Sequence, residues 1–393
     1  MRVGLDLLYL TPGESGGRES YARELVPEML ARSPRLELVA FVNRDAGAEL
    51  ARELGVRAVV LPMSEGNRAQ WAVGELVLVA VAAGRARVQL LHSMANFAPA
   101  WGPFRRVVTL HDLQYKVHPE LLSWPTRAAT TALVSLAAHR AQRIIAVSAA
   151  GREEIVAGLG IERERIDVIP NGVRPPPSGA SAGELRRGLE LEERPVVLSV
   201  ATNLPHKNLP MLIDALALIE PSKRPALVFA GHGTDDGQLA ARAAAAGLAA
   251  DVRLLGRCSD DELESLYALA ACLVLPTLHE GFGMPVLEAM ARSVPVACSD
   301  IPALREVGGD AALFFDPRTP RQIAARIADA IADGHTQARL RELGRLQAAR
   351  FSWAAAANAT LASYRRALGT PPPPAMEIRQ EPPWQASPGQ TTR

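Results

Sequence analysis

Residues 276–291 read PTLHEGFGMPVLEAMA and hold two carboxylates, Glu280 and Glu288, on either side of a glycine-rich core. Pro285 suits the first turn of a helix, because it lacks a backbone N–H that would be unused there and its φ is already set. The stretch therefore predicts a loop that carries Glu280, followed by a helix that carries Glu288. The two acids are expected to face a shared space from different elements.

The same loop has the chemistry of a nucleotide-sugar site. Gly281 and Gly283 let the backbone approach a ligand closely, and the free N–H groups at the start of the helix can hold a phosphate. Carboxylates that accept hydrogen bonds from neighbouring hydroxyls suit a sugar. The alternative is a Gly-Pro turn before a core helix with two surface acids, and the short pattern alone leaves both interpretations open.

The stretch resembles the donor-site signature of the group 1 (family 4-type) retaining glycosyltransferases, which have the GT-B fold. In that signature two glutamates, with seven residues between them, enclose a Gly-Phe-Gly core, and residues 294–317 continue the likeness. The resemblance extends from residue 2 to about residue 366. It implies an α/β architecture of two Rossmann-like, doubly wound parallel-sheet domains that face a cleft.

Length and hydrophobic patterning favour the same architecture. A chain of 393 residues suits two domains of roughly 150–200 residues each. Short apolar runs alternate with helical stretches, which predicts βαβ units and parallel sheets. The expected strands are residues 3–7, 37–42, 58–61, 88–92, 107–110 and 143–147 in the first half, and 196–200, 226–230, 252–255, 271–275 and 294–297 in the second.

The composition along the chain suggests where the domains end. We expect an N-terminal, acceptor-side domain at residues 1–174 and a C-terminal, nucleotide-sugar-binding domain at residues 191–350. Residues 175–190 open with three prolines and are predicted to be a linker. The resemblance implies that residues 351–369 form a helix that packs back on the N-terminal domain. The polar, Pro-rich tail at residues 370–393 is predicted to be disordered.

Charge and cysteine content exclude several other classes of protein. With 43 basic and 42 acidic residues, the chain gives no sign of binding nucleic acid. Cys258, Cys272 and Cys298 have no metal-ligand spacing and fit reduced thiols of a cytoplasmic protein. The N-terminus lacks the layout of a signal peptide, and the apolar run 76–83 is far below the roughly 20 residues that span a membrane.

Two further candidates lie in loops that follow strands in the first half, where parallel sheets bind ligands. His111 follows the strand 107–110 and resembles the family histidine beside the transferred sugar, where imidazole can donate or accept a hydrogen bond. A lone histidine is, however, often structural. Gly17 lies in a Gly-Gly turn that resembles the family's loop near the donor phosphates. The alternative is a plain strand-to-helix turn without a role in binding.

In the second half, His206 and Lys207 resemble the family's basic loop beside the donor diphosphate. An ammonium group there could neutralise charge on the departing diphosphate. The alternative is a solvated lysine, although a cation near a helix N-terminus opposes the dipole unless an anion is expected. Many relatives carry an arginine in this loop, whereas this chain has His206 and, further back, Thr202. Which group replaces that arginine is left open.

The resemblance also assigns roles position by position. It places Glu280 on hydroxyls of the donor sugar, Glu288 on the ribose, and the amides of residues 282–284 near the sugar and phosphates. The loop at residues 256–258 would frame the base. The predicted catalytic residues are His111, Lys207 and Glu280, and the predicted donor-binding residues are Gly17, His206, Gly256, Arg257, Cys258, Gly281, Phe282, Gly283, Met284 and Glu288.

The resulting hypothesis is a retaining hexosyltransferase that uses a nucleotide-diphosphate sugar, such as GDP-mannose, and a glycan or lipid-linked acceptor in polysaccharide biosynthesis. We expect no cofactor and no metal, because the acidic pairs 235–236 and 260–261 fit turns and helix starts rather than a metal site. A lipid-linked acceptor would bring arginine-bearing helices such as residues 127–143 to the inner face of the membrane.

Two alternatives from other classes stay open. A GT-B nucleotide-sugar epimerase would share the fold, although the long match through residues 280–317 argues against it. A non-catalytic nucleotide-sugar-binding partner would keep the binding residues and lose those that serve the leaving group, and the missing arginine fits that case.

Overall fold

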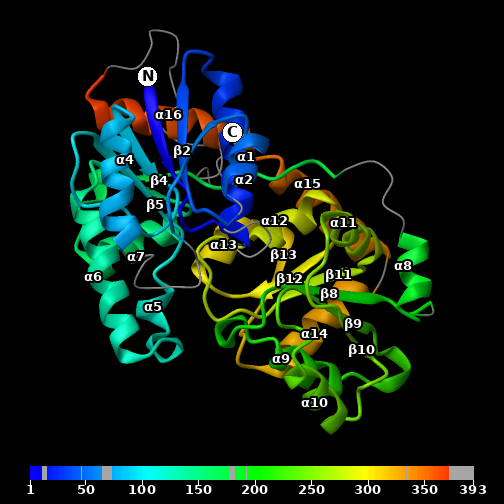
Figure 1. Cartoon of the computed structure of the whole chain (residues 1–393). Helices are drawn as coiled ribbons and strands as arrows, with labels where there is room; N and C mark the ends of the chain where they lie inside the picture. The colour runs from blue at the N-terminus through cyan, green and yellow to red at the C-terminus, as the bar shows by residue number, and fades with distance from the viewer. Residues whose placement is uncertain are drawn as a thin grey trace, which may run out of the picture. The chain divides into compact units, whose positions relative to one another are not determined.

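The computed structural model of the chain describes residues 1–10, 16–45, 47–63, 73–176, 182–191, 193–332 and 334–370 (Figure 1). The chain splits into two compact units. The first comprises Met1–Gly172 together with Ser352–Arg393, and the second comprises Val173–Phe351. The chain therefore leaves the first unit at Gly172 and returns to it at Ser352.

A seven-stranded parallel sheet forms the centre of the first unit, in the order β3-β2-β1-β4-β5-β6-β7. Its strands are β1 (Arg2–Asp6), β2 (Glu37–Val42), β3 (Arg57–Val60), β4 (Leu90–Ser93), β5 (Arg105–Leu110), β6 (Arg143–Ala146) and β7 (Ile166–Val168). Its helices are α1 (Gly17–Arg32), α2 (Gly47–Glu53), η1 (Gly74–Leu78), α4 (Val79–Arg85), α5 (Gln114–Val117), η2 (Pro119–Leu121), α6 (Trp124–Arg140), α7 (Ala149–Leu159), η3 (Arg163–Arg165) and α16 (Trp353–Leu368). The inner strands are largely buried, as a sheet covered on both faces requires.

The C-terminal helix α16 packs against α1 and is anchored to the sheet by polar side chains. The Tyr364 hydroxyl lies 2.7 Å from Nδ1 of His92 on β4. Ser363 donates a hydrogen bond of 2.7 Å to Asp167 on β7. At the other end, Gly172 runs so close to the start of α16 that a side chain there would collide with the backbone of Trp353. Glycine at this position therefore lets the helix dock.

A six-stranded parallel sheet forms the centre of the second unit, in the order β10-β9-β8-β11-β12-β13. Its strands are β8 (Val196–Val200), β9 (Ala226–Ala230), β10 (Val252–Leu254), β11 (Cys272–Leu275), β12 (Val296–Ser299) and β13 (Ala312–Phe315). Its helices are α8 (Ala182–Gly188), η4 (Pro205–Lys207), α9 (Pro210–Ala217), η5 (Pro221–Lys223), α10 (Gln238–Ala245), α11 (Asp260–Leu269), α12 (Met284–Ala291), α13 (Pro302–Gly308), η6 (Gly309–Ala311), α14 (Pro320–Ile331) and α15 (Gly334–Ala348).

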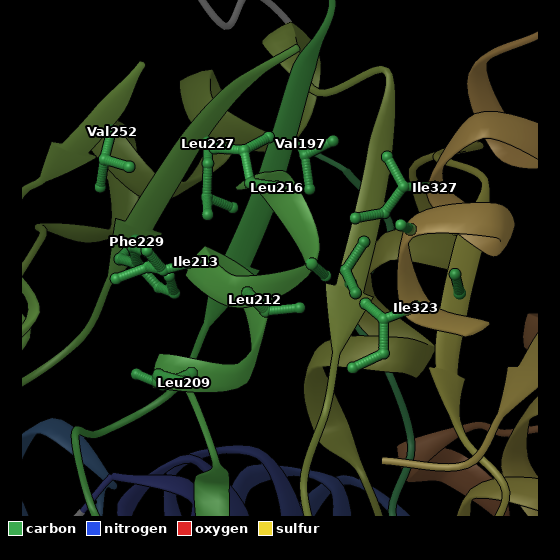
Figure 2. Close-up of a cluster of buried hydrophobic side chains, with 14 of the residues drawn as sticks. Val197, Leu209, Leu212, Ile213, Leu216, Leu227, Phe229, Val252, Ile323 and Ile327 are labelled. Carbon is green, nitrogen blue, oxygen red and sulfur yellow. The ribbon is translucent and has the colours of Figure 1, made fainter. Parts of the chain in front are cut away.

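A hydrophobic core of this second unit lies between the sheet and two helices, as Figure 2 shows. Leu212 and Leu216 of α9, together with Ile323 and Ile327 of α14, are fully buried against the strands. Burial of each such side chain contributes about 1.5–3 kcal/mol. This packing gives the loops at the carboxyl ends of the strands a rigid base.

Three elements differ from the sequence-based expectation. Strands β7 and β13, each at the edge of its sheet, were not predicted. Helix α8 occupies part of the predicted linker 175–190 and packs against α11, so that prediction was wrong for residues 182–188. The reason is that Glu, Leu and Arg are strong helix formers, which outweighs the small and Pro-rich residues before them.

Two earlier predictions fall on residues outside the described ranges. These are residues 177–181 of the predicted linker and all of the predicted disordered tail except Thr370. In the described part of the chain, no helix has the length and apolar character needed to cross a membrane.

Candidate active site

The predicted residues of the second unit lie in loops that follow neighbouring strands. Strands β8 and β11 pair in parallel, with Leu198 opposite Leu273. After β8 the chain adds β9 and β10 on one side of the sheet, and β11 then begins the other side. Loops leave β8 and β11 in opposite directions at such a switch point, which is where open parallel sheets bind ligands.

Hydrogen bonds join the loop after β8 to the loop after β11. The backbone N–H of Leu278 donates to the carbonyl of His206 at 2.7 Å, and the Thr277 hydroxyl lies 3.1 Å from the same oxygen. The side-chain amide of Asn208 donates to the Pro276 carbonyl at 3.1 Å. Asn208 has a φ of +56°, a left-handed conformation that asparagine tolerates better than most residues. The two loops therefore hold each other in place.

Lys207 and Glu280 form an ion pair across these two loops. Nζ of Lys207 lies 2.6 Å from Oε1 of Glu280, and the side chains are only 19% and 12% exposed. The family resemblance implies that these residues bind different parts of a donor, and their contact with each other is a feature of the tertiary structure. An ammonium has three donors and a carboxylate two oxygens, so each group keeps capacity for a ligand while the pair fixes its position.

Gly283 sets the start of helix α12, which follows this loop. It precedes the helix with a φ of +103°, and any side chain there would run into Leu304. Pro285 occupies the first turn of the helix, as predicted from the sequence. Phe282 is buried, with its ring centroid 5.9 Å from that of Phe351. A glycine is therefore required at position 283 by both backbone conformation and space.

Glu288 lies in the second turn of α12 and accepts a hydrogen bond of 2.8 Å from the hydroxyl of Tyr267 on α11. Burial raises the pKa of the Glu288 carboxyl, while the Tyr267 hydroxyl and the charge of Arg292 lower that pKa. Arg292 lies over the Tyr267 ring, 5.0 Å from its centroid, and forms an ion pair with Glu264. Tyr267 was not predicted as a site residue, because it lies on a different helix and only the folded chain brings it to Glu288.

The loops after β9 and β10 are also joined to each other. Gly231 N–H donates to the Gly256 carbonyl at 2.7 Å, and Gly256 N–H donates to the Thr234 hydroxyl at 3.0 Å. Nε of Arg257 lies 3.4 Å from Nδ1 of His232. Gly256, with a φ of +64°, is one of the residues expected to frame the base.

The remaining predicted residue of this loop, Cys258, is half-buried. Burial raises the pKa of its thiol, with a smaller contribution from Glu262. A raised pKa keeps the thiol protonated near neutral pH, so Cys258 is suited to packing or weak hydrogen bonding rather than to nucleophilic chemistry.

In the first unit, His111 stands directly after β5 in a defined orientation. Its Nε2 lies 2.9 Å from the Met94 carbonyl, which can only accept, so Nε2 carries the proton and Nδ1 the lone pair. Tyr21 meets the ring edge-on, with centroids 5.0 Å apart. Burial lowers the pKa of His111 to about 4, against a raising effect of the Met94 carbonyl and with a further lowering by Arg18. The imidazole is therefore neutral near pH 7.

Gly17 is the first residue of α1 and is exposed. Among the described residues, nothing lies within 4 Å of where its side chain would start. Its neighbour Gly16, with a φ of +53°, is the position where the turn favours glycine.

Comparison with known proteins identifies the family. Residues 182–347 match the family model for "Glycosyl transferases group 1", and residues 15–175 match the model for "Glycosyltransferase Family 4". "O-antigen chain mannosyltransferase B" of Escherichia coli is 31% identical over 276 residues, which cover 66% of this chain and 70% of that relative. The chain belongs to the group 1 glycosyltransferases. The family resemblance drawn from the sequence is thereby confirmed.

Other proteins extend the comparison of this glycosyltransferase. "O-antigen chain mannosyltransferase RfbU" of Salmonella typhimurium is 28% identical and matches over 54% of this chain and 57% of its own length. Sucrose-phosphate synthase of Thermosynechococcus elongatus has a TM-score of 0.76 at 20% identity, covering 94% of this chain and 99% of that chain. Anabaena HepE with UDP-glucose has a TM-score of 0.75 at 21% identity, covering 92% and 100%. The predicted fold class, two Rossmann-like domains of the GT-B type, is confirmed.

Proposed function

We propose that this glycosyltransferase moves a mannosyl or related hexosyl unit, with retention, from a nucleotide-diphosphate sugar such as GDP-mannose to a hydroxyl of a glycan or lipid-linked acceptor. The observation that carries the proposal is the joined pair of loops at the switch point of the second sheet, where Lys207 and Glu280 lie together before α12. A cation, a carboxylate and helix-start amides suit the diphosphate and the sugar hydroxyls of one donor. Relatives named as mannosyltransferases support the choice of hexose.

Three side chains of the second unit are each assigned a part of the donor. Lys207 neutralises charge on the diphosphate, and the free oxygen of Glu280 accepts hydrogen bonds from sugar hydroxyls. Glu288 accepts from the ribose. His206, which stands where many relatives carry an arginine, is only 5% exposed, so we assign the leaving-group charge to Lys207 and the amides of α12.

Retention is proposed to follow from substitution on one face of the sugar. The bond between the anomeric carbon and the diphosphate oxygen breaks through an oxocarbenium-like state, and the acceptor oxygen bonds to the same face. The acceptor proton passes to the departing diphosphate oxygen. His111 is neutral, with its lone pair on Nδ1, so it serves as a hydrogen-bond acceptor for a sugar hydroxyl and not as a general acid.

Metal independence is part of the same proposal. Its support is the presence of Lys207, an ammonium that can take the place of a divalent cation beside the diphosphate. In the described ranges, no group of three or more His, Cys, Asp or Glu side chains could hold a metal ion. We propose no cofactor besides the donor itself.

A contact with the membrane surface from the cytoplasmic side would accompany a lipid-linked acceptor. Helix α6 carries Arg127 and Arg140 and contains no acidic residue. Trp124, its first residue, is 72% exposed, which suits insertion at a lipid interface. Sedimentation with anionic vesicles should bind the protein, and Trp124→Ser should weaken this binding. Equal sedimentation with neutral and anionic vesicles would argue against the charge-based contact.

The first test is a thermal-shift screen against GDP-mannose, UDP-glucose, UDP-N-acetylglucosamine, dTDP-rhamnose and the free nucleotides. One donor should stabilise the protein, and Glu288→Ala should abolish that stabilisation. With this donor and an acceptor, NMR of the product should show the anomeric configuration of the donor; an inverted product would contradict retention. An altered sugar without acceptor would identify an epimerase, and binding without any product would identify a non-catalytic partner.

A further inference from the structure

Tyr267 is a buried tyrosine whose side-chain hydroxyl contacts a residue of the proposed donor site. It lies in the last turns of α11 and is 1% exposed. Its hydroxyl donates to Oε2 of Glu288 at 2.8 Å. A buried hydroxyl needs a partner, and here the partner is a carboxylate rather than a backbone carbonyl.

The nearby guanidinium of Arg292 donates to other acceptors. Arg292 donates from Nε to Glu264 at 2.7 Å and from a terminal nitrogen to the backbone carbonyl of Glu288 at 3.0 Å. The guanidinium is thus held by those acceptors while its face covers the Tyr267 ring. Of the two carboxylate oxygens of Glu288, Oε2 accepts from the hydroxyl, and no side chain in the described part of the chain is seen to donate to Oε1.

We propose that Tyr267 is a positioning residue, whose hydroxyl fixes Oε2 of Glu288 and so presents Oε1 to the ribose of the donor. The terminal torsion of a glutamate is broad, and a hydrogen bond to one oxygen selects one orientation of the carboxylate plane. The inference rests on the proposed function, in which Glu288 binds the ribose. It adds a residue of α11 to a site otherwise made from loops and α12.

The same hydroxyl favours the charged form of Glu288, against the effect of burial. Burial raises the pKa of this carboxyl, and Glu264 and Asp260 of α11 raise the pKa further; Tyr267 and Arg292 oppose them. Burial and Glu288 raise the pKa of Tyr267 far above its usual range, so the tyrosine stays protonated and donates. An ionised carboxylate has acceptor sites only, so both lone pairs of Oε1 can accept from neighbouring ribose hydroxyls, whereas protonation would turn one of these sites into a donor.

Tyr267→Phe tests the proposal, because it deletes one oxygen and keeps the ring under Arg292. Affinity for the stabilising nucleotide sugar is measured by calorimetry from pH 5 to pH 8. We expect about tenfold weaker binding, the effect of losing one hydrogen bond to a charged group. Binding needs ionised Glu288, so it is lost as pH falls through the Glu288 pKa. Without the hydroxyl that pKa rises, and the acidic limb of the affinity profile should move to higher pH.

Tyr364→Phe is the matched control, since Tyr364 is another buried tyrosine whose hydroxyl contacts a side chain, Nδ1 of His92 at 2.7 Å. It should cost comparable thermal stability and leave the acidic limb in place. If Tyr267→Phe lowers stability but leaves the limb unmoved, Tyr267 is merely structural and the proposal is wrong. Should that variant fail to fold, Tyr267→3-fluorotyrosine, whose hydroxyl is a stronger donor, should move the limb to lower pH, and an unmoved limb overturns the proposal.

Glu288→Gln separates this inference from the function on which it rests. Unchanged donor affinity in Glu288→Gln would refute the ribose contact itself. Weakened affinity in Glu288→Gln, together with an unmoved limb in Tyr267→Phe, would refute the role of Tyr267 and leave the donor site standing.

Discussion

Replacing Lys207 by methionine separates its role in catalysis from its role in stability. Methionine keeps most of the apolar stem and removes the charge that lies 2.6 Å from Glu280. If Lys207 stabilises the departing diphosphate, kcat should fall by about 10²–10³-fold, the loss found when one preorganised charge-stabilising donor is removed, or about 2.7–4 kcal/mol.

The effect on stability should be smaller and can be bounded from the burial of the pair. Exposed ion pairs contribute about 0–1 kcal/mol, whereas breaking a buried pair costs about 3–5 kcal/mol. Lys207 and Glu280 are 19% and 12% exposed, between these limits. We therefore expect Lys207→Met to lower the free energy of unfolding by about 1–2 kcal/mol in urea titrations, because Glu280 is left without its partner.

The double variant Lys207→Met, Glu280→Gln distinguishes the two effects. It should recover much of the stability, because no unpaired charge is left, but it should not recover kcat. Lys223→Met is the matched control, since Lys223 is 79% exposed and pairs with Glu220 at the surface. It should change neither quantity measurably. A kcat within threefold of wild type in Lys207→Met, measured with the donor from the screen, would refute the assignment of the leaving-group charge to Lys207.

Three further predictions concern the start of α12, the buried histidines and metal use. Gly283→Ala should lower the free energy of unfolding by about 1–3 kcal/mol, because φ is +103° and Leu304 is in the way, whereas Gly188→Ala, with nothing described within 4 Å, should be nearly neutral in the same urea titration. Burial lowers the pKa of His92 to about 3 and that of His111 to about 4. In the unfolded chain both histidines regain the usual pKa, near 6.5, so below that pH the unfolded chain binds more protons than the folded protein. Stability should therefore fall as pH drops from about 6.5 toward 4, and His92→Asn should flatten that slope; an equal slope would contradict it. Transfer activity should survive dialysis against EDTA, and loss that Mg²⁺ or Mn²⁺ restores would refute metal independence.

The sequence predicted the parts of this protein that local patterns encode. Apolar runs marked eleven strands, and the Gly-Phe-Gly loop before Pro285 marked the start of α12. The edge strands β7 and β13 were not predicted. Helix α8 was missed because the small, Pro-rich residues before it suggested a linker.

The sequence by itself determined the family, the fold class and which loops carry polar groups, because repeat spacing, turn residues and motifs are properties of neighbouring residues. Only the tertiary structure decided which of those groups meet. Lys207 pairs with Glu280 across 73 positions, and Tyr267 reaches Glu288 from another helix. The protonation of His111 likewise depends on the Met94 carbonyl and on the residues that bury the imidazole ring. The charge and orientation of a side chain depend on the residues that pack around it, and most of those residues are distant in sequence.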